Sequence, residues 1–228
     1  MNPSVDFLLL EPEQGGNLGS ICRALKTFGF GPPLLVRAAE GIERSPEARR
    51  LAHGAREYLD QLVRYDDLET ALAPYDFRIA TTARRRRTVA EYLPVDELTE
   101  RLGEKGKSIT KVALLFGSEA SGLPSNALHS CDLVTTIPLS TSYPSLNLAQ
   151  ALLLYAYTLS NLSRESTASD EAAEEGDTGE YRALVARIEA VMSRNSGNPA
   201  LIGRIRERLT HIREEDVALI HSVLNALE

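Results

Sequence analysis

Cysteine, histidine and long apolar runs are scarce in this chain of 228 residues. The two cysteines, Cys22 and Cys131, allow at most one disulfide, and because nothing marks a secretory context we expect both thiols to be reduced. The four histidines have no metal-ligand spacing among themselves or with the cysteines, so no metal site is expected. No apolar run is long enough to span a membrane, and the N-terminus has no recognisable leader. These absences predict a cytoplasmic protein without a membrane partner.

A positive net charge is also missing. The formal net charge of -7 argues against a nucleic-acid partner, because phosphate recognition needs clustered Lys and Arg. The acids are concentrated, however, between Asn161 and Glu180. This segment contains seven Asp and Glu residues and one basic residue, Arg164, so it accounts for -6 of the net charge of -7. The rest of the chain is nearly neutral and contains local basic clusters. Net charge therefore does not exclude nucleic acid.

Short apolar runs alternate with helical patterns in the first 162 residues, and a hydrophobic content of 43% suffices for one sizeable core. Strands are expected at 5–10, 34–36, 77–81, 112–116 and 133–137. Helices are expected from a cap at Asn17 to Gly29, and within 46–58, 95–102, 124–128 and 146–162. This alternation predicts an α/β fold whose parallel sheet has helices on both faces.

The composition changes after residue 162. The segment 163–180 is rich in Ser, Thr, Glu and Asp and has too little apolar content to fold alone, which predicts an acidic flexible linker. Apolar residues return at helical spacing within 181–228 and predict two or three short helices. We therefore expect an α/β domain over 1–162, a linker over 163–180 and a helical extension over 181–228.

The first of three informative segments, Gly15–Gly29, places glycines at the start of a helix that carries Asn17 and Arg23. Glycine lets a ligand approach the backbone closely, and Arg23 follows Asn17 by about one and a half turns, within reach of a phosphate near the cap. A capped helix with a surface arginine is the alternative. The segment has no Gly-x-Gly-x-x-Gly pattern and is not the dinucleotide-binding motif.

The second segment, Leu114–Pro124, leads from an apolar strand into a glycine-flanked loop that displays Glu119. Thr81, Thr82 and Ala83 end another predicted strand. Because the carboxyl ends of parallel strands meet at one edge of a sheet, these residues are expected to surround a polar ligand there. An ordinary surface charge is the alternative for Glu119.

The third segment, Ile137–Ala149, joins a strand to a long apolar helix through a polar turn containing Ser145 and Asn147. Unpaired backbone N–H groups and the helix dipole favour polar or anionic ligands at such a position. The turn is therefore predicted to form part of a binding site.

Two arginine clusters are candidates for phosphate contacts. Arg84, Arg85, Arg86 and Arg87 follow a predicted strand end, and Arg204, Arg206 and Arg208 lie in the tail. Phosphate binding by such clusters weakens strongly with salt. A solvated loop is the alternative for the first cluster, and neighbouring glutamates partly neutralise the second.

Together, the three segments resemble the SpoU branch of the SPOUT RNA methyltransferases. That branch combines an Asn-Leu-Gly…Arg helix, a Phe-Gly-x-Glu-x-x-Gly loop and a Ser-Leu-Asn turn, and order, spacing and residue types agree here over about Val5 to Ser160. The stretch Ala24–Phe30, the Thr-Thr-Ala-Arg block and the tail stretch Asn198–Leu209 are most similar to the subfamily that methylates tRNA ribose at position 32 of the anticodon loop.

The resemblance implies a deep C-terminal trefoil knot, in which the segment around 139–162 threads through an earlier loop. It also implies a homodimer whose two active sites each use both subunits, S-adenosylmethionine as methyl donor and tRNA as substrate. The implied cofactor-binding residues are Thr81, Thr82, Ala83, Gly117, Ile137, Pro144, Ser145 and Leu146. The implied catalytic residues are Arg23, Asn17, Glu119, Ser145 and Asn147, and the implied RNA-binding residues are the seven arginines of the two clusters.

The resemblance assigns activation of the ribose 2′-hydroxyl to Arg23. A guanidinium keeps its proton beyond about pH 12 and is a weak general base. We therefore expect Arg23 to position phosphate and ribose, to stabilise the developing alkoxide, and to relay the proton to a neighbouring phosphate. Asn17 is expected to orient Arg23 or the ribose, and Glu119 to fix the loops.

Two other functions are compatible with the same sequence. One is a ribosomal-RNA ribose methyltransferase of the same fold, and the other is a non-catalytic RNA-binding or assembly factor. Presence of all five implied catalytic residues disfavours the second. The pattern does not choose between cytidine and uridine, because both carry the 2′-hydroxyl.

Overall fold

The computed structural model describes residues 2–83, 92–141, 145–166, 179–195 and 199–227. Within these residues the core is a seven-stranded, wholly parallel sheet in the order β3-β2-β1-β6-β4-β7-β5. The strands are β1 (Ser4–Leu10), β2 (Leu34–Val36), β3 (Arg64–Tyr65), β4 (Phe77–Thr81), β5 (Leu93–Pro94), β6 (Lys111–Phe116) and β7 (Leu133–Thr136). The predicted α/β class and parallel sheet are confirmed.

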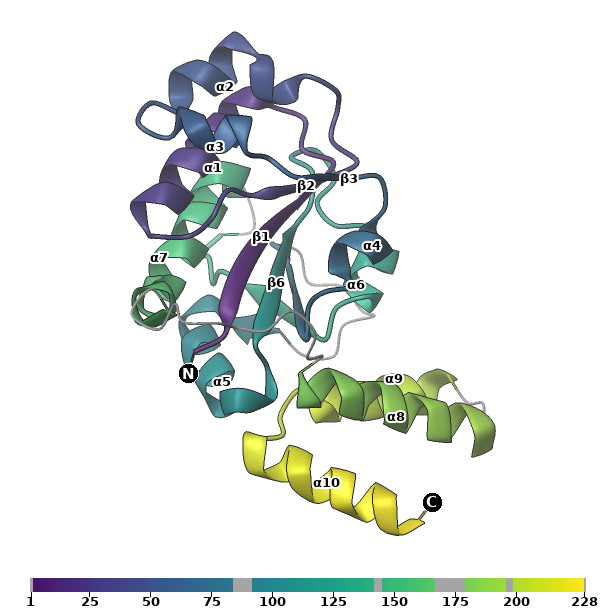
Figure 1. Cartoon of the computed structure of the whole chain (residues 1–228). Coiled ribbons are helices and arrows are strands. Elements are labelled where there is room, and N and C mark those ends of the chain that lie inside the picture. The colour runs from purple at the N-terminus through teal and green to yellow at the C-terminus, as the bar shows by residue number, and fades with distance from the viewer. Residues whose placement is uncertain (1, 84–91, 142–144, 167–178, 196–198, 228) are drawn as a thin grey trace.

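Helices cover both faces of the sheet (Figure 1). One face carries α1 (Gly15–Thr27), α2 (Pro46–Leu51), α3 (Arg56–Asp60), α5 (Leu98–Glu104) and α7 (Leu148–Ser166). The other carries α4 (Leu68–Leu72) and α6 (Ser125–His129). Short 3-10 turns occupy η1 (Ile42–Arg44), η2 (Val95–Glu97) and η3 (Gly106–Ser108). Because β1 and β6 are covered on both sides, Phe7–Leu10 of β1 and Val112–Phe116 of β6 are continuous apolar runs rather than alternating ones.

The structure corrects three details of the predicted elements. The first helix begins at Gly15, and Asn17 does not cap it; Gln14 occupies the cap position and makes no side-chain bond there. The predicted helical region 46–58 is two helices, α2 and α3, separated by a turn at Gly54, whose φ of 81° suits glycine. The two-residue strands β3 and β5 and the short helix α4 are too brief to produce a recognisable sequence pattern.

Three tail helices lie beyond the amino ends of the strands: α8 (Glu180–Asn195), α9 (Pro199–Leu209) and α10 (Glu214–Leu227). Figure 1 shows them at the end of the sheet where β1 and β6 begin. Tyr181, Leu184 and Val185 of α8 are fully buried in the same apolar cluster as Phe77 of β4. The tail therefore closes one end of the main core, while residues 167–178 of the predicted linker lie outside the described residues.

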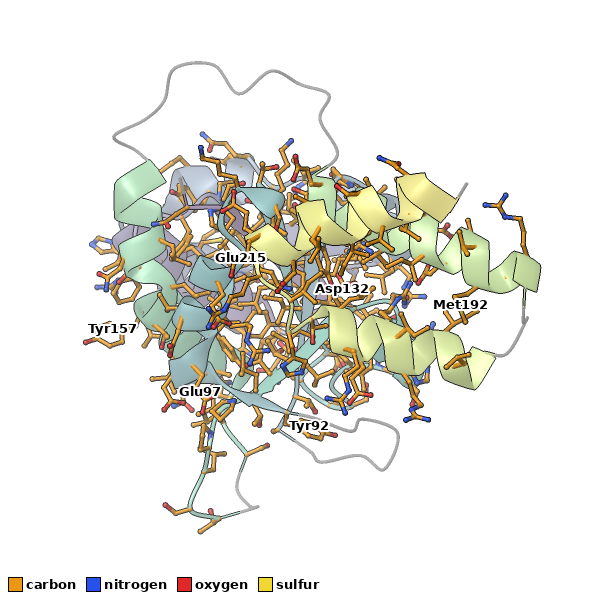
Figure 2. The ribbon with its side chains drawn as sticks, turned by 90° about the horizontal axis from the view of Figure 1, so that it is seen from below. Tyr92, Glu97, Asp132, Tyr157, Met192 and Glu215 are labelled. Atoms are coloured by element: carbon orange, nitrogen blue, oxygen red, sulfur yellow. The ribbon has the colours of Figure 1, made fainter. Side chains whose placement is uncertain are left out.

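Buried carboxylates fix the start of α8 against the sheet. The Asp76 carboxylate accepts hydrogen bonds from Gly179 N at 2.6 Å and from Thr110 N at 2.8 Å. Arg182 donates to the Asp76 carbonyl at 3.0 Å and forms an ion pair of 2.5 Å with Asp132, whose side chain is 1% exposed. In Figure 2, which views the molecule from the tail side, Asp132 lies behind these helices.

Lys105 forms a second buried contact with the tail. It is 0% exposed, and its ammonium donates to the carbonyls of Leu209 at 3.1 Å and Ile212 at 2.9 Å, just at the end of α9. The same nitrogen lies 4.5 Å from the ring centroid of Tyr181 and 5.4 Å from that of Phe77. Cation–π attraction and the partial negative charge of a helix C-terminus both favour a cation at this point.

The described residues contain no helix long and apolar enough to cross a membrane. Within the same ranges, no three His, Cys, Asp or Glu side chains group as a metal site would require. Cys22 and Cys131 are both free and buried, and burial raises the pKa of the Cys22 thiol to about 12.

Candidate active site

A cavity of about 490 Å³ opens where β4, β6 and β7 end. Its walls come from the second and third of the sequence segments, as the loop 117–123 after β6 and the turn before α7, and from Gln14, which directly precedes the first segment. The predicted cofactor-binding residues Thr81, Thr82, Ala83, Gly117, Ile137, Ser145 and Leu146 all line it. The eighth, Pro144, lies outside the described residues. Carboxyl ends of parallel strands are the usual ligand-binding edge of such sheets, and the volume suits a molecule of nucleoside size.

Hydrogen bonds to both neighbouring strands fix the end of β4 in the cavity wall. The Thr81 hydroxyl donates to the Leu115 carbonyl of β6 at 3.0 Å. Thr82 N donates to the Thr135 carbonyl of β7 at 3.0 Å. The last residues of β4 are therefore rigid where they meet a ligand.

The loop after β6 turns back on itself at the cavity. Gly122 N donates to the Ser118 carbonyl at 2.9 Å, and a Cβ on Gly117 would lie 2.1 Å from the Gly122 carbonyl carbon. Only glycine fits at position 117, because any side chain would push the two arms of the loop apart. This close approach brings Glu119 back toward the start of α1.

Glu119 joins this loop to the first segment. One carboxylate oxygen accepts from Asn17 Nδ2 at 2.8 Å and Gln14 N at 3.2 Å, and the other accepts from Glu13 N at 2.9 Å. The carboxylate therefore binds backbone N–H groups at the approach to α1 that no helix carbonyl can satisfy. Its two oxygens hold the β1–α1 connection against the β6 loop.

Asn147 joins the third segment to the same network. Its Nδ2 donates to Asn17 Oδ1 at 2.9 Å, while its Oδ1 accepts from Ala149 N at 2.8 Å and so caps α7. Asn17, which is 8% exposed, thus bridges Glu119 and Asn147. Side-chain hydrogen bonds therefore connect Asn17 to Glu119, 102 positions away, and to Asn147, 130 positions away.

Arg23 lies outside this network and does not line the cavity. It is exposed on α1, beyond the buried turn that holds Ile21 and Cys22. Neither an ion pair nor a side-chain hydrogen bond engages its guanidinium within the described residues, so the group can contact a bound molecule.

The cavity favours neutral or positively charged ligands. Glu119 carries the one ionisable carboxylate in the described lining, and that lining contains neither Lys nor Arg. Apolar contacts come from Ile137, Leu148 and the Tyr155 ring, while burial raises the pKa of the Tyr155 hydroxyl. A phosphate-rich nucleotide would find no cation among the described lining residues, which disfavours an ordinary nucleotide site.

The structure separates the predicted RNA-binding arginines into different groups. Arg204 and Arg208 are exposed on α9. Arg206 instead forms an ion pair with Glu189 at 2.5 Å and donates to the His129 carbonyl at 3.2 Å, linking α9 to α8 and α6. The cluster Arg84, Arg85, Arg86 and Arg87 lies outside the described residues.

Sequence reasoning missed three residues of the cavity wall, which lie outside the three segments and Thr81–Ala83: Gln14, Ala151 and Tyr155. Gln14 immediately precedes the glycine pair that marked the first segment, and its position beside the motif was the available signal. Tyr155 packs in the core, with its ring 5.4 Å from that of Phe116, and it also forms part of the cavity wall.

Comparison with known proteins identifies the family of this chain. The sequence profile of the SpoU rRNA Methylase family matches residues 4–157. The uncharacterized tRNA/rRNA methyltransferase LasT of Escherichia coli is 32% identical over 98% of this chain and 97% of its own length. The tRNA (cytidine/uridine-2'-O-)-methyltransferase TrmJ of Photorhabdus laumondii is 28% identical, covering 100% of this chain and 98% of that protein.

A solved structure extends the likeness to the tail. TrmJ from Z. mobilis superposes with a TM-score of 0.66 at 25% identity, covering 100% of this chain and 99% of that one. The match therefore includes the helices after the acidic segment as well as the sheet. With most of its length matched by the profile and a relative 32% identical over nearly the whole chain, the protein belongs to the SpoU rRNA Methylase family.

Proposed function

We propose that this protein is an S-adenosylmethionine-dependent tRNA ribose 2′-O-methyltransferase acting at nucleotide 32 of the anticodon loop. The observation that carries the proposal is the cavity lined by the second and third motif segments, to which the Glu119–Asn17–Asn147 network joins the first segment. The TrmJ relatives, which align along the whole chain, support the tRNA substrate. We place this activity in the cytoplasm.

The described residues fit S-adenosylmethionine. The cavity combines backbone groups at three strand ends with apolar walls and one carboxylate, which suits an adenosine joined to a positively charged sulfonium. We assign binding to the seven described residues that line the cavity, and to Pro144, which lies outside the described residues. When bound, S-adenosylmethionine supplies an electrophilic methyl group.

Arg23 is assigned the contact with the acceptor RNA. Its exposed guanidinium has five N–H donors in a planar fork, the arrangement that binds phosphate well. We propose that Arg23 orients the phosphate next to the target ribose and stabilises negative charge on the 2′-oxygen. The proton of the hydroxyl then passes to a neighbouring phosphate oxygen, because the guanidinium itself stays protonated.

Glu119, Asn17 and Asn147 are assigned positioning roles. Each already uses its side chain in the network, so these groups hold α1, the β6 loop and the start of α7 in register. Asn17 then orients Arg23 by fixing the beginning of α1 and not by contacting it. Ser145 lines the cavity and is assigned a direct polar contact there.

A homodimer and a trefoil knot complete the proposal. Leu153, Leu154 and Tyr157 of α7 are 42%, 40% and 67% exposed, and Figure 2 shows Tyr157 projecting outward from the body. An apolar helix face of this kind supports a subunit interface. We propose that the paired subunits complete each active site, and that the segment around 139–162 is knotted as the SPOUT resemblance implies.

The extension 181–228 is proposed to contact tRNA through Arg204 and Arg208. Arg206 is assigned a structural role instead, because both of its contacts lie within the chain. Since Tyr181, Leu184 and Val185 belong to the main core, deletion of the tail would expose that core. Substitution of Arg204 and Arg208 is therefore the appropriate test of this contact.

Replacement of Arg23 by Ala tests the proposed chemistry. Methyl transfer to tRNA should fall by at least about 100-fold, because charge stabilisation at the reacting oxygen is removed. Binding of S-adenosylmethionine, measured by calorimetry, should stay within about twofold, since Arg23 does not line the cavity. Undiminished methylation by the variant would refute the role given to Arg23.

A ribosomal-RNA substrate is the second candidate. The observation favouring it is the LasT relative, whose name covers both tRNA and rRNA. Sequencing-based mapping of 2′-O-methylated nucleotides in total RNA from a deletion strain distinguishes the two candidates. Disappearance of a methyl group from rRNA alone would favour this alternative.

A further inference from the structure

A strongly basic surface lies on α2 and its flanks, outside both the cavity and the arginine clusters discussed above. Residues 44–56 contain four arginines and one acid, Glu47, a net charge of +3 in a chain of net charge -7. We call the four arginines the α2 strip: Arg44, Arg49, Arg50 and Arg56. All four are exposed, with side-chain exposures of 81% for Arg44 and 51% for Arg49.

Tight packing fixes the α2 strip relative to α1. A Cβ on Gly19 would lie 2.2 Å from the Ala48 carbonyl oxygen, so the two backbones are in direct contact. Ala48 and Ala52 are fully buried on this side. Helical geometry places Arg50 about 200° around the helix from Ala48, which directs its guanidinium away from α1 and into solvent.

Internal ion pairs leave the α2 strip available for another anion. Arg50 has no ion pair within the described ranges. Arg49 reaches Asp60 only at 4.0 Å, and Arg44 reaches Glu43 at 3.5 Å while Glu43 pairs more closely with Arg64. Exposed ion pairs of this kind are weak and give way readily to a stronger partner.

The α2 strip begins beside the mouth of the cavity. Gln14 lines the cavity, and the next residue, Gly15, lies so close to Ser45 that an added Cβ would be 2.0 Å from the Ser45 hydroxyl. Arg44 directly precedes Ser45. The helices then run in the same direction, because Lys26 near the end of α1 donates to the Gly54 carbonyl at 2.8 Å. Arg23 is exposed on this same α1.

From this arrangement we infer that the α2 strip holds the phosphate backbone of the RNA whose target ribose is presented at the cavity to the methyl donor. The inference rests on the proposed function, since it requires an RNA substrate. Arginines on an exposed helix bind successive phosphates without reading bases, so the strip sets the position and orientation of the RNA rather than its sequence. The RNA would therefore extend from the cavity along α1 and α2.

The test is a charge-removing triple variant, R44Q/R49Q/R50Q, compared with the charge-retaining R44K/R49K/R50K. Binding of unmodified tRNA is measured by fluorescence anisotropy from about 50 to 200 mM salt, the range over which phosphate binding weakens. The Gln variant should bind at least about tenfold more weakly, and its log–log salt slope should fall by about one for each phosphate that it no longer neutralises. The Lys variant should keep wild-type affinity within about threefold.

Two controls make the outcome unambiguous. Circular dichroism and S-adenosylmethionine calorimetry should be unchanged in both variants, since none of the three side chains lines the cavity. Unchanged tRNA affinity and slope in the Gln variant, or equally weakened binding in both variants, would overturn the inference. If the wild type binds and methylates an rRNA fragment instead of tRNA, the proposed tRNA substrate is wrong. The Gln and Lys variants are then compared on that fragment, and the same criteria show whether the α2 strip binds its phosphates.

Discussion

Several side chains in this protein connect segments that lie far apart in the sequence, and their positions in the sequence do not reveal these contacts. Asn17 lies in a helix, yet its amide bridges a carboxylate 102 positions away and another amide 130 positions away. Glu119 is a loop charge by sequence, but it accepts three hydrogen bonds at the approach to α1. The chemistry proposed for Arg23 therefore depends on groups that do not touch it.

Replacement of Glu119 by Gln tests this dependence. The amide of this variant keeps one acceptor oxygen but places an NH₂ group where the second oxygen accepted a hydrogen bond, so at least one of the three donors loses its charged partner. The free energy of unfolding should fall by about 1–3 kcal/mol, measured by urea denaturation, and methyl transfer should fall with it. In the control E13Q, stability and activity should be preserved, because Glu13 contributes only its backbone N–H. Wild-type stability in E119Q would show that the network is not energetically important.

The buried Lys105 ammonium is expected to make the free energy of unfolding increase with pH in the alkaline range. Burial lowers the pKa of the folded-state ammonium from 10.5 to about 8. Between these values the unfolded chain binds more protons than the folded one, so the free energy of unfolding rises with pH across that window. A shift of this size corresponds to about 3 kcal/mol.

The comparison of wild type with K105M isolates that effect, because all other titrating groups are shared. The unfolding free energy of the wild type relative to K105M should increase by about 3 kcal/mol between about pH 7 and pH 10.5. Urea denaturation at a series of pH values measures it. A difference that stays constant over this range would contradict the buried, weakened ammonium.

At the level of elements, the contact between α1 and α2 depends on small residues. Gly15 and Gly19 lie one turn apart on α1 and receive Ser45 and Ala48 from α2. This contact aligns the helix bearing Arg23 with the α2 strip. Its geometry therefore affects both the proposed chemistry and the inferred RNA path.

The variant G19A tests the packing directly. Its methyl group would lie 2.2 Å from the Ala48 carbonyl oxygen, so the helices must separate, at a cost of about 1–3 kcal/mol. Gly203 of α9 is the matched control, since nothing lies within 4 Å of its added Cβ. G203A should gain about 0.5–1 kcal/mol from helix propensity. Equal melting temperatures for the two variants would argue against close α1–α2 contact.

Elements differ in how far the sequence predicts them. The central strands are predictable because strands buried on both faces are continuous apolar runs, as in Val112–Phe116. Asn17 was wrongly predicted as a helix cap, because local preference favours Asn there while its actual partner Glu119 is distant in sequence. The three motif segments were predictable as one edge of the sheet, since strand ends in parallel sheets converge.

Other features could not be predicted because polar contacts between distant segments leave no periodic pattern. Lys105 reads as an ordinary surface lysine, yet it is fully buried beneath the tail. Asp76 receives the start of α8 across 103 positions. The packing of the extension 181–228 against the sheet therefore could not be predicted from the sequence.

At the level of the whole molecule, the two ends of the sheet differ in structure. The carboxyl ends of the strands hold the cavity, and the amino ends hold the tail, with the α2 strip extending from the first along the helical face. An RNA that presents its target ribose at the edge of the cavity would contact the α2 strip near that nucleotide. This arrangement allows recognition of the RNA by the position of its backbone, with the reacting ribose held next to the bound methyl donor.

Site mapping of the transferred methyl group tests the central proposal most directly. The full-length protein is incubated with labelled S-adenosylmethionine and two unmodified tRNAs that differ only in carrying ribose or 2′-deoxyribose at nucleotide 32. The proposal predicts one 2′-O-methyl group, at nucleotide 32 of the first tRNA, and no incorporation into the second. Equal incorporation into both, or methylation of rRNA with none in tRNA, would contradict it.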